Sequence, residues 1–249
     1  MKRTHDNFYI NEDNTHVKDS FIAVADAIGD GFKGSMADLG CATGAFPHYL
    51  NSRFPEARIV GIEYLDVLLK KAKEDFPNLE FVSGDITDKC SVVEEFDVIT
   101  MIGVLAIFDD YPKVLGNVLS WLKPKGRLIL LEMINNFDID TFVKYKPSSG
   151  IFRSEDLESG WNIFSKKSLQ LICEQNGATL VECNNFEISV DLSPNNSDPM
   201  RSWTELDRNG RRQIYNALQI RQPQQIAIFE SSANQPVQLE NNAKIPAVE

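Results

Sequence analysis

Short apolar runs alternate with amphipathic segments along the first half of the chain. The runs are bounded by turn residues, which predicts strands, whereas the segments between them repeat apolar residues at helical spacing. This alternation predicts β-α-β units and therefore an α/β fold on a mostly parallel sheet. The expected strands are 36–39, 58–63, 80–83, 96–101 and 127–133, and the expected helices are 17–28, 45–54, 65–75 and 111–122.

The alternation of strand and helix patterns ends after residue 134. Residues 134–164 are rich in Asp, Asn, Ser and aromatic side chains, and residues 191–222 form a second irregular stretch. We expect both stretches to be insertions that cover a substrate. The elements expected around them are a helix at 166–175 and strands at 178–183, with a continuation through 186–190 left open, and at 225–230.

Composition narrows the class of protein. With 249 residues and 43% apolar content the chain can bury a full core, so we expect residues 1–230 to form one domain and residues 231–249, rich in Gln and Asn, to form a flexible tail. A net charge of -11 without a cluster of Lys and Arg argues against a nucleic-acid partner. No apolar run is long enough for a membrane span, so we expect a cytoplasmic protein. No cysteine pair indicates a metal site, and a homodimer stays open.

A glycine-containing loop follows the first expected strand. Residues 38–44 read Asp-Leu-Gly-Cys-Ala-Thr-Gly, and the small residues at 40, 42 and 44 let the backbone approach a ligand without Cβ clashes. Glu63 ends the second expected strand, where a carboxylate can accept hydrogen bonds from both hydroxyls of a ribose. The loop and Glu63 together indicate a bound adenosine cofactor.

The spacing of this loop argues against a dinucleotide. A nicotinamide-binding fingerprint reads Gly-x-Gly-x-x-Gly, whereas this loop reads Gly-x-Ala-x-Gly. Asp38 also stands at the strand tip, where an acid suits a ligand with ammonium and sulfonium groups better than a pyrophosphate. In these residues the chain resembles the class I S-adenosylmethionine (SAM)-dependent methyltransferases, in their small-molecule branch.

The resemblance implies a doubly wound, Rossmann-like sheet of seven strands, mostly parallel with an antiparallel last strand, and SAM as the cofactor. It implies that Asp38 helps to hold the amino group of SAM, that Asp85 accepts from the adenine amino group, and that Ile86 and Tyr64 cover the adenine ring. Core packing is the competing interpretation for Tyr64, and a cap or turn role for Asp38. The backbone near Met101 faces the methionine part. The expected cofactor-binding residues are Asp38, Gly40, Ala42, Gly44, Glu63, Tyr64, Asp85, Ile86 and Met101.

A general base is hard to find. Many small-molecule members of the family carry a Glu-His pair after the fourth strand, where this chain has Ala106 and Ile107. Asp109 and Asp110 lie just past that strand, at the edge where open α/β sheets bind ligands, and are the catalytic candidates. Their competing role is to cap the helix expected from residue 111.

Two segments in the insertions carry aromatic and basic residues. Residues 160–165 (Gly-Trp-Asn-Ile-Phe-Ser) and 198–203 (Asp-Pro-Met-Arg-Ser-Trp) resemble methyltransferases of bacterial polysaccharide and surface-glycan pathways. Trp and Arg suit a sugar ring or a carboxylate, although both Trp side chains could instead anchor the core. The substrate candidates are Arg153, Trp161, Asn162, Arg201 and Trp203.

These observations leave three functions to compare. The first is a SAM-dependent methyltransferase that acts on a hydroxyl of a small polar molecule, a sugar or a glycan. The second is a carboxylate or natural-product methyltransferase, which the missing base favours because an ionised carboxylate is already a nucleophile. The third is a catalytically silent SAM-binding regulatory protein, kept open by Ala106 and Ile107.

Overall fold

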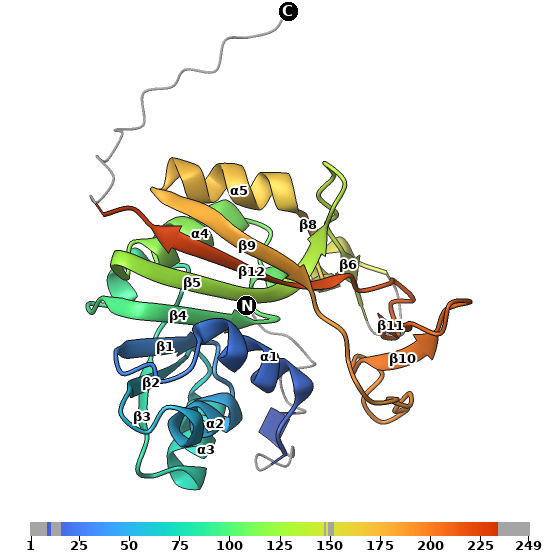
Figure 1. The fold of residues 1–249 in the computed structure, drawn as a ribbon. Coiled ribbons are helices and arrows are strands. Elements are labelled where there is room, and N and C mark those ends of the chain that lie inside the picture. Colours follow the sequence, from blue (N-terminus) through green and yellow to red (C-terminus); the bar gives the residue numbers. More distant parts are fainter. Residues whose placement is uncertain (1–8, 11–15, 147, 149–151, 234–249) are drawn as a thin grey trace, which may run out of the picture.

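The computed structural model describes residues 9–10, 16–146, 148 and 152–233 (Figure 1). Most of the expected tail, from residue 234 onward, lies outside the described residues. The helices are α1 (Asp19–Ile28), α2 (Ala45–Arg53), α3 (Asp66–Asp75), α4 (Tyr111–Leu119) and α5 (Lys166–Gln175), with single turns at η2 (Lys89–Ser91), η3 (Leu105–Ile107) and η4 (Ser154–Asp156). The strands are β1 (Ser35–Leu39), β2 (Arg58–Glu63), β3 (Glu80–Ser83), β4 (Phe96–Ile102), β5 (Leu122–Asn135), β6 (Lys144–Tyr145), β7 (Glu158–Ser159), β8 (Phe164–Ser165), β9 (Ala178–Asn185), β10 (Trp203–Leu206), β11 (Arg212–Tyr215) and β12 (Gln224–Ser231).

The central sheet has the strand order β3-β2-β1-β4-β5-β12-β9 (Figure 1). Strands β1 to β5 pair in parallel, and β12 runs antiparallel to both of its neighbours. This is the seven-stranded, mostly parallel, doubly wound sheet with an antiparallel last strand that the family resemblance implies. One short strand is added, because β8 pairs in parallel with the end of β5. The order matters for function because the ends of β1 to β5 meet at one edge.

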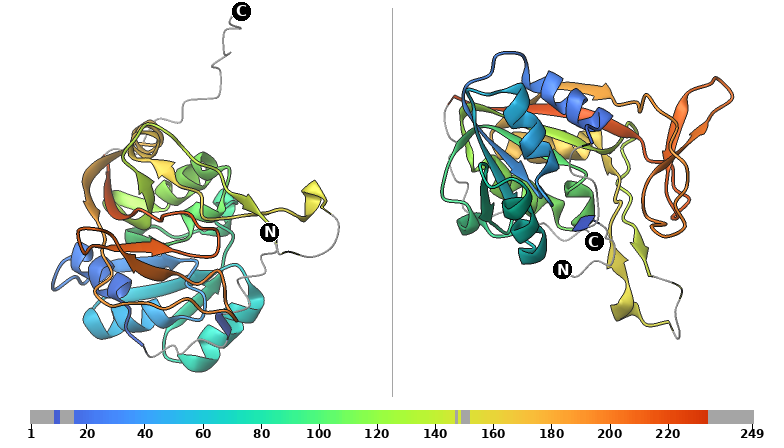
Figure 2. Two further views of the ribbon diagram at one scale, coloured as in Figure 1. Left: turned by 90° about the vertical axis from the view of Figure 1, so that its right-hand side faces the viewer. Right: turned by 90° about the horizontal axis from the view of Figure 1, so that it is seen from below.

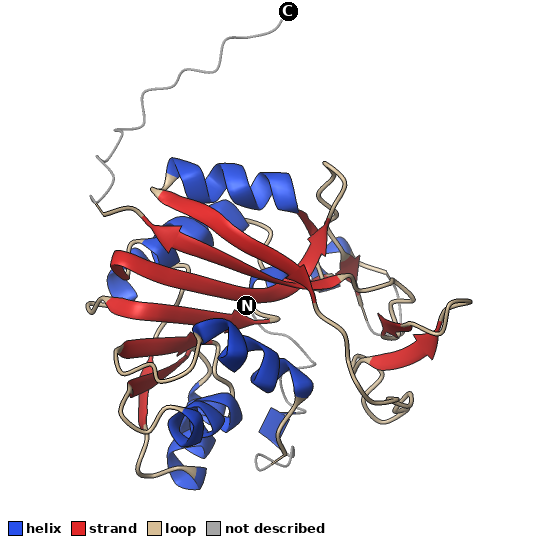
Figure 3. Cartoon of the chain, in the orientation of Figure 1, coloured by secondary structure: helices blue, strands red, loops and turns tan. Residues whose placement is uncertain are grey.

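Helices cover both faces of this sheet (Figure 3). On one face, α1 and α2 pack their apolar sides against Met36, Val98 and Ile129. On the other face, α4 and α5 pack against Ala37, Ile99 and the rest of the largest core cluster. Successive side chains of a strand point to opposite faces, so the nearly continuous apolar runs in β4 and β5 follow from this double coverage.

Two boundaries differ from the sequence prediction by three residues or more. The helix expected to run through residue 122 ends at Leu119, and β5 starts at Leu122 instead of 127. The Lys-Pro-Lys-Gly stretch lies inside β5 as an irregularity: Lys125 has a φ of 63°, and the pairing with β4 shifts register there. Pro124 cannot donate a ladder hydrogen bond, which is why the strand is locally distorted. The continuation of β9 through 186–190 is also absent, since β9 ends at Asn185.

Both expected insertions project from the end of the sheet where β4 and β5 finish (Figure 2). The first carries the β6–β7 pair and β8, and the second carries the β10–β11 hairpin. Within the described part of the chain, none of the helices is long and apolar enough to cross a bilayer.

Candidate cofactor and acceptor site

A cavity of about 420 Å³ opens at the carboxyl ends of β1 to β4. The loop after β1, the ends of β2 and β3, the loop after β4 and the start of α1 form its walls. Parallel strands end at a common edge, which brings these segments together although they are far apart in sequence. Seven of the nine residues expected to bind the cofactor line it: Asp38, Gly40, Ala42, Glu63, Tyr64, Asp85 and Ile86.

The loop after β1 depends on two glycines for different reasons. Gly40 has a φ of 69°, and a Cβ there would lie 2.8 Å from a methyl carbon of Val104, which also lines the cavity. Gly44 has a φ of 87°, but a Cβ there would lie 2.7 Å from the ring of Phe81. Gly44 does not line the cavity, which corrects the expectation that it approaches the ligand. It is required for the packing of the loop against β3 and for the left-handed start of α2.

Glu63 joins β2 to this loop. Its side chain is buried, and its two carboxylate oxygens accept hydrogen bonds from the backbone N–H groups of Ala42 (2.9 Å) and Leu65 (2.8 Å). A carboxylate has about four lone-pair sites, and Glu63 also lines the cavity. Glu63 therefore shapes the loop and can contact a ligand at the same time.

Asp38 lies beside Glu63 at the end of β1. It is 4% exposed and accepts a hydrogen bond of 2.9 Å from the Thr100 hydroxyl. Burial raises the pKa of Asp38 to about 7; the Thr100 hydrogen bond opposes this rise, and the charge of Glu63 adds to it. Two acids so close together in a partly dry pocket favour a cationic ligand, which would return Asp38 to its charged form.

Asp85, Ile86 and Tyr64 are the residues expected at the adenine ring, and the structure gives Asp85 a structural role as well. Asp85 Oδ1 accepts hydrogen bonds from the backbone N–H (2.8 Å) and hydroxyl (2.7 Å) of Thr87, which fixes the turn after β3. Ile86 is buried at the cavity wall. Tyr64 is 53% exposed and lines the cavity, so core packing is the wrong interpretation for it.

Met101 is the second expected residue that does not line the cavity. Its side chain is fully buried in the core, while Ile102 and Gly103 form the wall. The expectation for Met101 concerned its backbone, which a buried side chain does not contradict, since successive side chains of β4 face opposite sides. The cavity-lining positions at the end of this strand are 102 and 103.

Neither catalytic candidate lines the cavity. Asp110 accepts a hydrogen bond from Lys113 N (3.4 Å) and caps α4, which was its competing role. Asp109 pairs with Lys144 and accepts a hydrogen bond of 2.6 Å from the Ser159 hydroxyl, so it ties the loop after β4 to the first insertion. These hydrogen bonds and the Lys144 charge hold the pKa of Asp109 below its usual value against the opposing effect of burial.

The structure brings none of the five substrate candidates into the cavity lining. Asn162 is fully buried within the first insertion, and Trp161 packs edge-on against Tyr145 at 5.5 Å. Arg153 is exposed near η4. In the second insertion Arg201 forms an ion pair with Asp198, and Trp203 is 8% exposed. For both Trp side chains the structure therefore favours the anchoring role.

Sequence reasoning missed two groups at the site. Tyr9, Lys18, Ser20 and Phe21 line the cavity from the N-terminal side, where no motif marks them. Glu132 is 2% exposed in β5 and accepts hydrogen bonds from the backbone N–H groups of the loop after β4. Its one sequence signal is a carboxylate inside an otherwise apolar strand. In the described part of the chain, no group of three His, Cys, Asp or Glu could hold a metal ion.

Comparison with known proteins identifies the family. The sequence model described as "Methyltransferase domain" matches residues 33–178, which include every strand that ends at the cavity. The chain belongs to this family. As a methyltransferase domain it uses S-adenosyl-L-methionine as its cofactor, and the expectation of a SAM-dependent methyltransferase is confirmed.

The sequence alignments with relatives span about two fifths of this methyltransferase and a similar share of each relative. Trans-aconitate 2-methyltransferase of Yersinia pseudotuberculosis is 32% identical over 103 residues, 41% of this chain and 39% of that protein. The protein of the same name from Deinococcus radiodurans is 34% identical over 94 residues, 37% of this chain and 35% of that protein.

Solved structures share the fold at low identity. A putative methyltransferase of Haloferax volcanii, in complex with the Trm112 activator, has a TM-score of 0.61 at 12% identity and covers 94% of this chain and 100% of that chain. CalS10, an amino pentose methyltransferase from Micromonospora echinaspora, has a TM-score of 0.52 at 13% identity, with 93% and 98% covered.

The charges that line the cavity suit SAM. Its walls combine apolar side chains with Asp38, Glu63 and Asp85, and the positive φ and missing Cβ of Gly40 leave room where a side chain would collide with Val104. A phosphate-binding loop would instead present its backbone N–H groups without buried acids. The acids suit the ammonium and sulfonium groups of SAM and the hydroxyls of its ribose.

Proposed function

We propose that this methyltransferase transfers the methyl group of SAM to a carboxylate oxygen of a small organic acid. The observation that carries the proposal is the charge pattern of the cavity. Lys18 is the only Lys, Arg or His among its described lining residues, and it lies on the N-terminal side, at the start of α1. A negatively charged acceptor that approaches a cation of this lining would do so beside Lys18, whose Nζ also lies 5.5 Å from the centre of the Phe21 ring.

The cofactor would lie across the strand ends in the order of the sheet. Asp85 after β3 would accept from the adenine amino group, Glu63 at the end of β2 would bind the ribose hydroxyls, and Asp38 at the end of β1 would help hold the ammonium group. The next strand in this order is β4, so the loop after β4 would face the methyl group and the acceptor.

A carboxylate acceptor explains the lack of a general base. When bound, SAM supplies a methyl group on a positively charged sulfur; an acceptor oxygen forms the new bond with its own lone pair, and the sulfur keeps the electrons of the broken bond. An ionised carboxylate loses no proton in this exchange, so the cavity needs no base. The chain would contribute the Lys18 charge for orientation and the apolar side chains of Ile107 and Phe108 to exclude water.

Two findings favour an acid over a sugar hydroxyl. The relatives that match about 40% of this chain are named for trans-aconitate, a small carboxylic acid. The aromatic and basic residues on which the sugar prediction rested do not line the cavity.

Acceptor screening tests the proposal. The purified protein would be incubated with SAM and separate panels of small carboxylic acids, trans-aconitate included, and of sugars, with products identified by mass spectrometry. We expect methyl esters, which base hydrolyses. Base-stable methyl ethers on sugars, with no ester formed, would refute the proposal.

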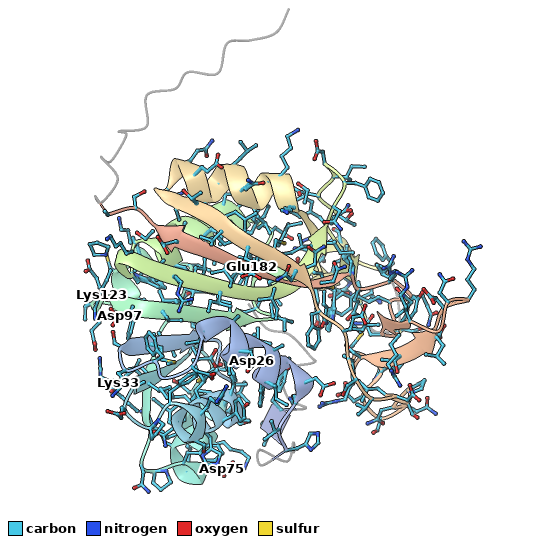
Figure 4. All side chains as sticks on the ribbon, in the orientation of Figure 1. Asp26, Lys33, Asp75, Asp97, Lys123 and Glu182 are labelled. Atoms are coloured by element: carbon cyan, nitrogen blue, oxygen red, sulfur yellow. The ribbon has the colours of Figure 1, made fainter. Side chains whose placement is uncertain are left out.

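Lys18→Gln tests the orienting charge. We expect the KM for the acid to rise by about tenfold or more, because a charged hydrogen bond is lost, while Lys18→Arg retains most of the affinity. Lys33→Gln is the matched control, since Lys33 is exposed at the opposite end of the sheet from the insertions (Figure 4). The affinity for S-adenosylhomocysteine, measured by calorimetry, separates a contact with the acceptor from one with the cofactor's own carboxylate.

A further inference from the structure

The loop after β4, residues 103–110, has one side toward the cavity and one toward the protein interior. Gly103, Val104, Ile107 and Phe108 line the cavity. The side chains of the residues between them, 105 and 106, are buried away from it. The position of this loop therefore sets the shape of the cavity on the side next to β5.

The two halves of the loop are held by different groups. Gly103 N–H donates to the Leu131 carbonyl (2.9 Å), so this end is fixed by the pairing of β4 with β5. Leu105 N–H donates to Glu132 Oε1 (2.6 Å) and Ala106 N–H to Glu132 Oε2 (3.3 Å). The N–H groups of residues 105 and 106 thus depend on a side chain, whereas those of Ile107 and Phe108 donate within the turn, to the Val104 (3.3 Å) and Leu105 (3.1 Å) carbonyls.

Asn162 holds the same part of the loop from the first insertion. Its backbone N–H donates to the Ala106 carbonyl (2.9 Å), and its side-chain Nδ2 donates to the Phe108 carbonyl (3.3 Å). Its Oδ1 accepts from Val143 N–H (2.8 Å), which anchors the insertion itself. Asn162 is fully buried, so these polar groups have no access to water and their partners matter.

The backbone next to Asn162 is strained. Trp161 has a φ of 58°, which is uncommon for a bulky residue, and a conformation of this kind persists only where the surroundings enforce it. This turn directs Asn162 inward, onto the loop. Ala106 is consequently held on both sides, through its N–H by Glu132 and through its carbonyl by Asn162.

We propose that Glu132 and Asn162 are positioning residues that clamp residues 105–108 from opposite sides and thereby place Ile107 and Phe108 against the methyl acceptor. The acceptor role rests on the proposed function, whereas the clamp itself does not. Because Gly103 is fixed separately, the clamp acts on acceptor binding and leaves cofactor binding largely unchanged.

Two substitutions test the clamp, one from each side. Glu132→Gln keeps the size of the side chain but places an NH₂ group against a backbone N–H, so one accepted hydrogen bond is lost. Asn162→Asp still accepts from Val143 but turns its second oxygen toward the Phe108 carbonyl and the Asp109 carboxylate, each 3.3 Å from Nδ2 in the wild type. If Glu132→Gln fails to fold, Asn162→Asp tests the same loop. Glu182→Gln, on an exposed side chain of β9, is the control.

The first measurement is backbone hydrogen exchange by NMR with S-adenosylhomocysteine bound. We expect the amides of Leu105 and Ala106 to exchange about tenfold faster or more in both variants, while those of Leu130 and Leu131 in β5 and all amides in the control keep the wild-type rates. Unchanged exchange at 105 and 106 would overturn the clamp. This result does not depend on which acceptor is used.

The second measurement separates positioning from mere stability. With trans-aconitate or another acid that the wild type methylates, we expect the KM for the acid to rise by about tenfold in both variants, with kcat reduced less and the Kd for S-adenosylhomocysteine within about threefold of wild type. An unchanged KM, or a loss of S-adenosylhomocysteine affinity equal to the rise in KM, would refute the positioning role. If the wild type methylates no acid, the proposed function fails and the exchange result alone decides the clamp.

Discussion

Replacing Glu132 by Gln should remove a pH-dependent component of the free energy of unfolding. Burial in β5 raises the pKa of Glu132 from 4.5 to about 8, although the backbone N–H groups of residues 104–106 lower it in part. The folded protein therefore binds a proton at this site between pH 4.5 and about 8 that the unfolded chain releases. Stability from this group is fully present below pH 4.5 and is lost as the pH rises through about 8.

The size of the effect follows from the two pKa values. At about 1.4 kcal/mol per pKa unit, the free energy of unfolding of the wild type should fall by roughly 3 to 4 kcal/mol between pH 5 and pH 8 through Glu132 alone. This is a large part of the roughly 5 to 15 kcal/mol that stabilises a typical domain. The amide introduced by Glu132→Gln cannot titrate, so the variant should lack this component.

Urea denaturation of both proteins without cofactor, at pH steps from 5 to 8, measures the difference. Asp38 also has a raised pKa, about 7, and loses stability in the same direction, but it is present in both proteins and cancels on subtraction. Two curves that stay parallel over this range would refute the raised pKa of Glu132. A difference of the opposite sign would mean that Glu132 is held mainly as a carboxylate by the loop N–H groups.

Two further substitutions test the cavity itself. Glu63→Gln should raise the Kd for S-adenosylhomocysteine by about tenfold or more, because an amide accepts at one oxygen only, while the Ala42 and Leu65 N–H groups and the ribose compete for it. Glu56→Gln, on an exposed side chain, is the control. A wild-type Kd in Glu63→Gln would exclude the ribose role. Gly40→Ala should lower the free energy of unfolding by about 1 to 3 kcal/mol more than Gly29→Ala. Both positions have a positive φ, but only a Cβ at residue 40 would collide, 2.8 Å from Val104. Equal losses of stability in urea denaturation would show that Val104 moves aside.

Local signals were enough for the cofactor side of the site. The apolar runs, the small residues between Asp38 and Gly44, and Glu63 at a strand end all lie within about 25 residues of each other. Once the runs are recognised as parallel strands joined by helices, their carboxyl ends must meet at one edge. Seven residues of the cavity lining could therefore be predicted from the sequence.

The acceptor side could not be predicted, because its contacts are long-range and carry no repeat or motif. Glu132 reaches its partners in the loop across 26 and 27 positions, and Asn162 reaches the Phe108 carbonyl across 54. Sequence reasoning named Asn162 and Asp109 but assigned them to substrate and catalysis, whereas the structure uses both to join the first insertion to the loop after β4.

The sequence by itself determined the fold class and seven of the residues that line the cavity, because these depend on periodicity and on short-range turn geometry. Tertiary structure alone decided that Lys18 enters the cavity, that Gly44 and Met101 face the core, and that Asp110 caps a helix. Each of these depends on which way a side chain points after packing. A polar residue at a strand end has the same local sequence pattern whether it meets a ligand or a backbone N–H group.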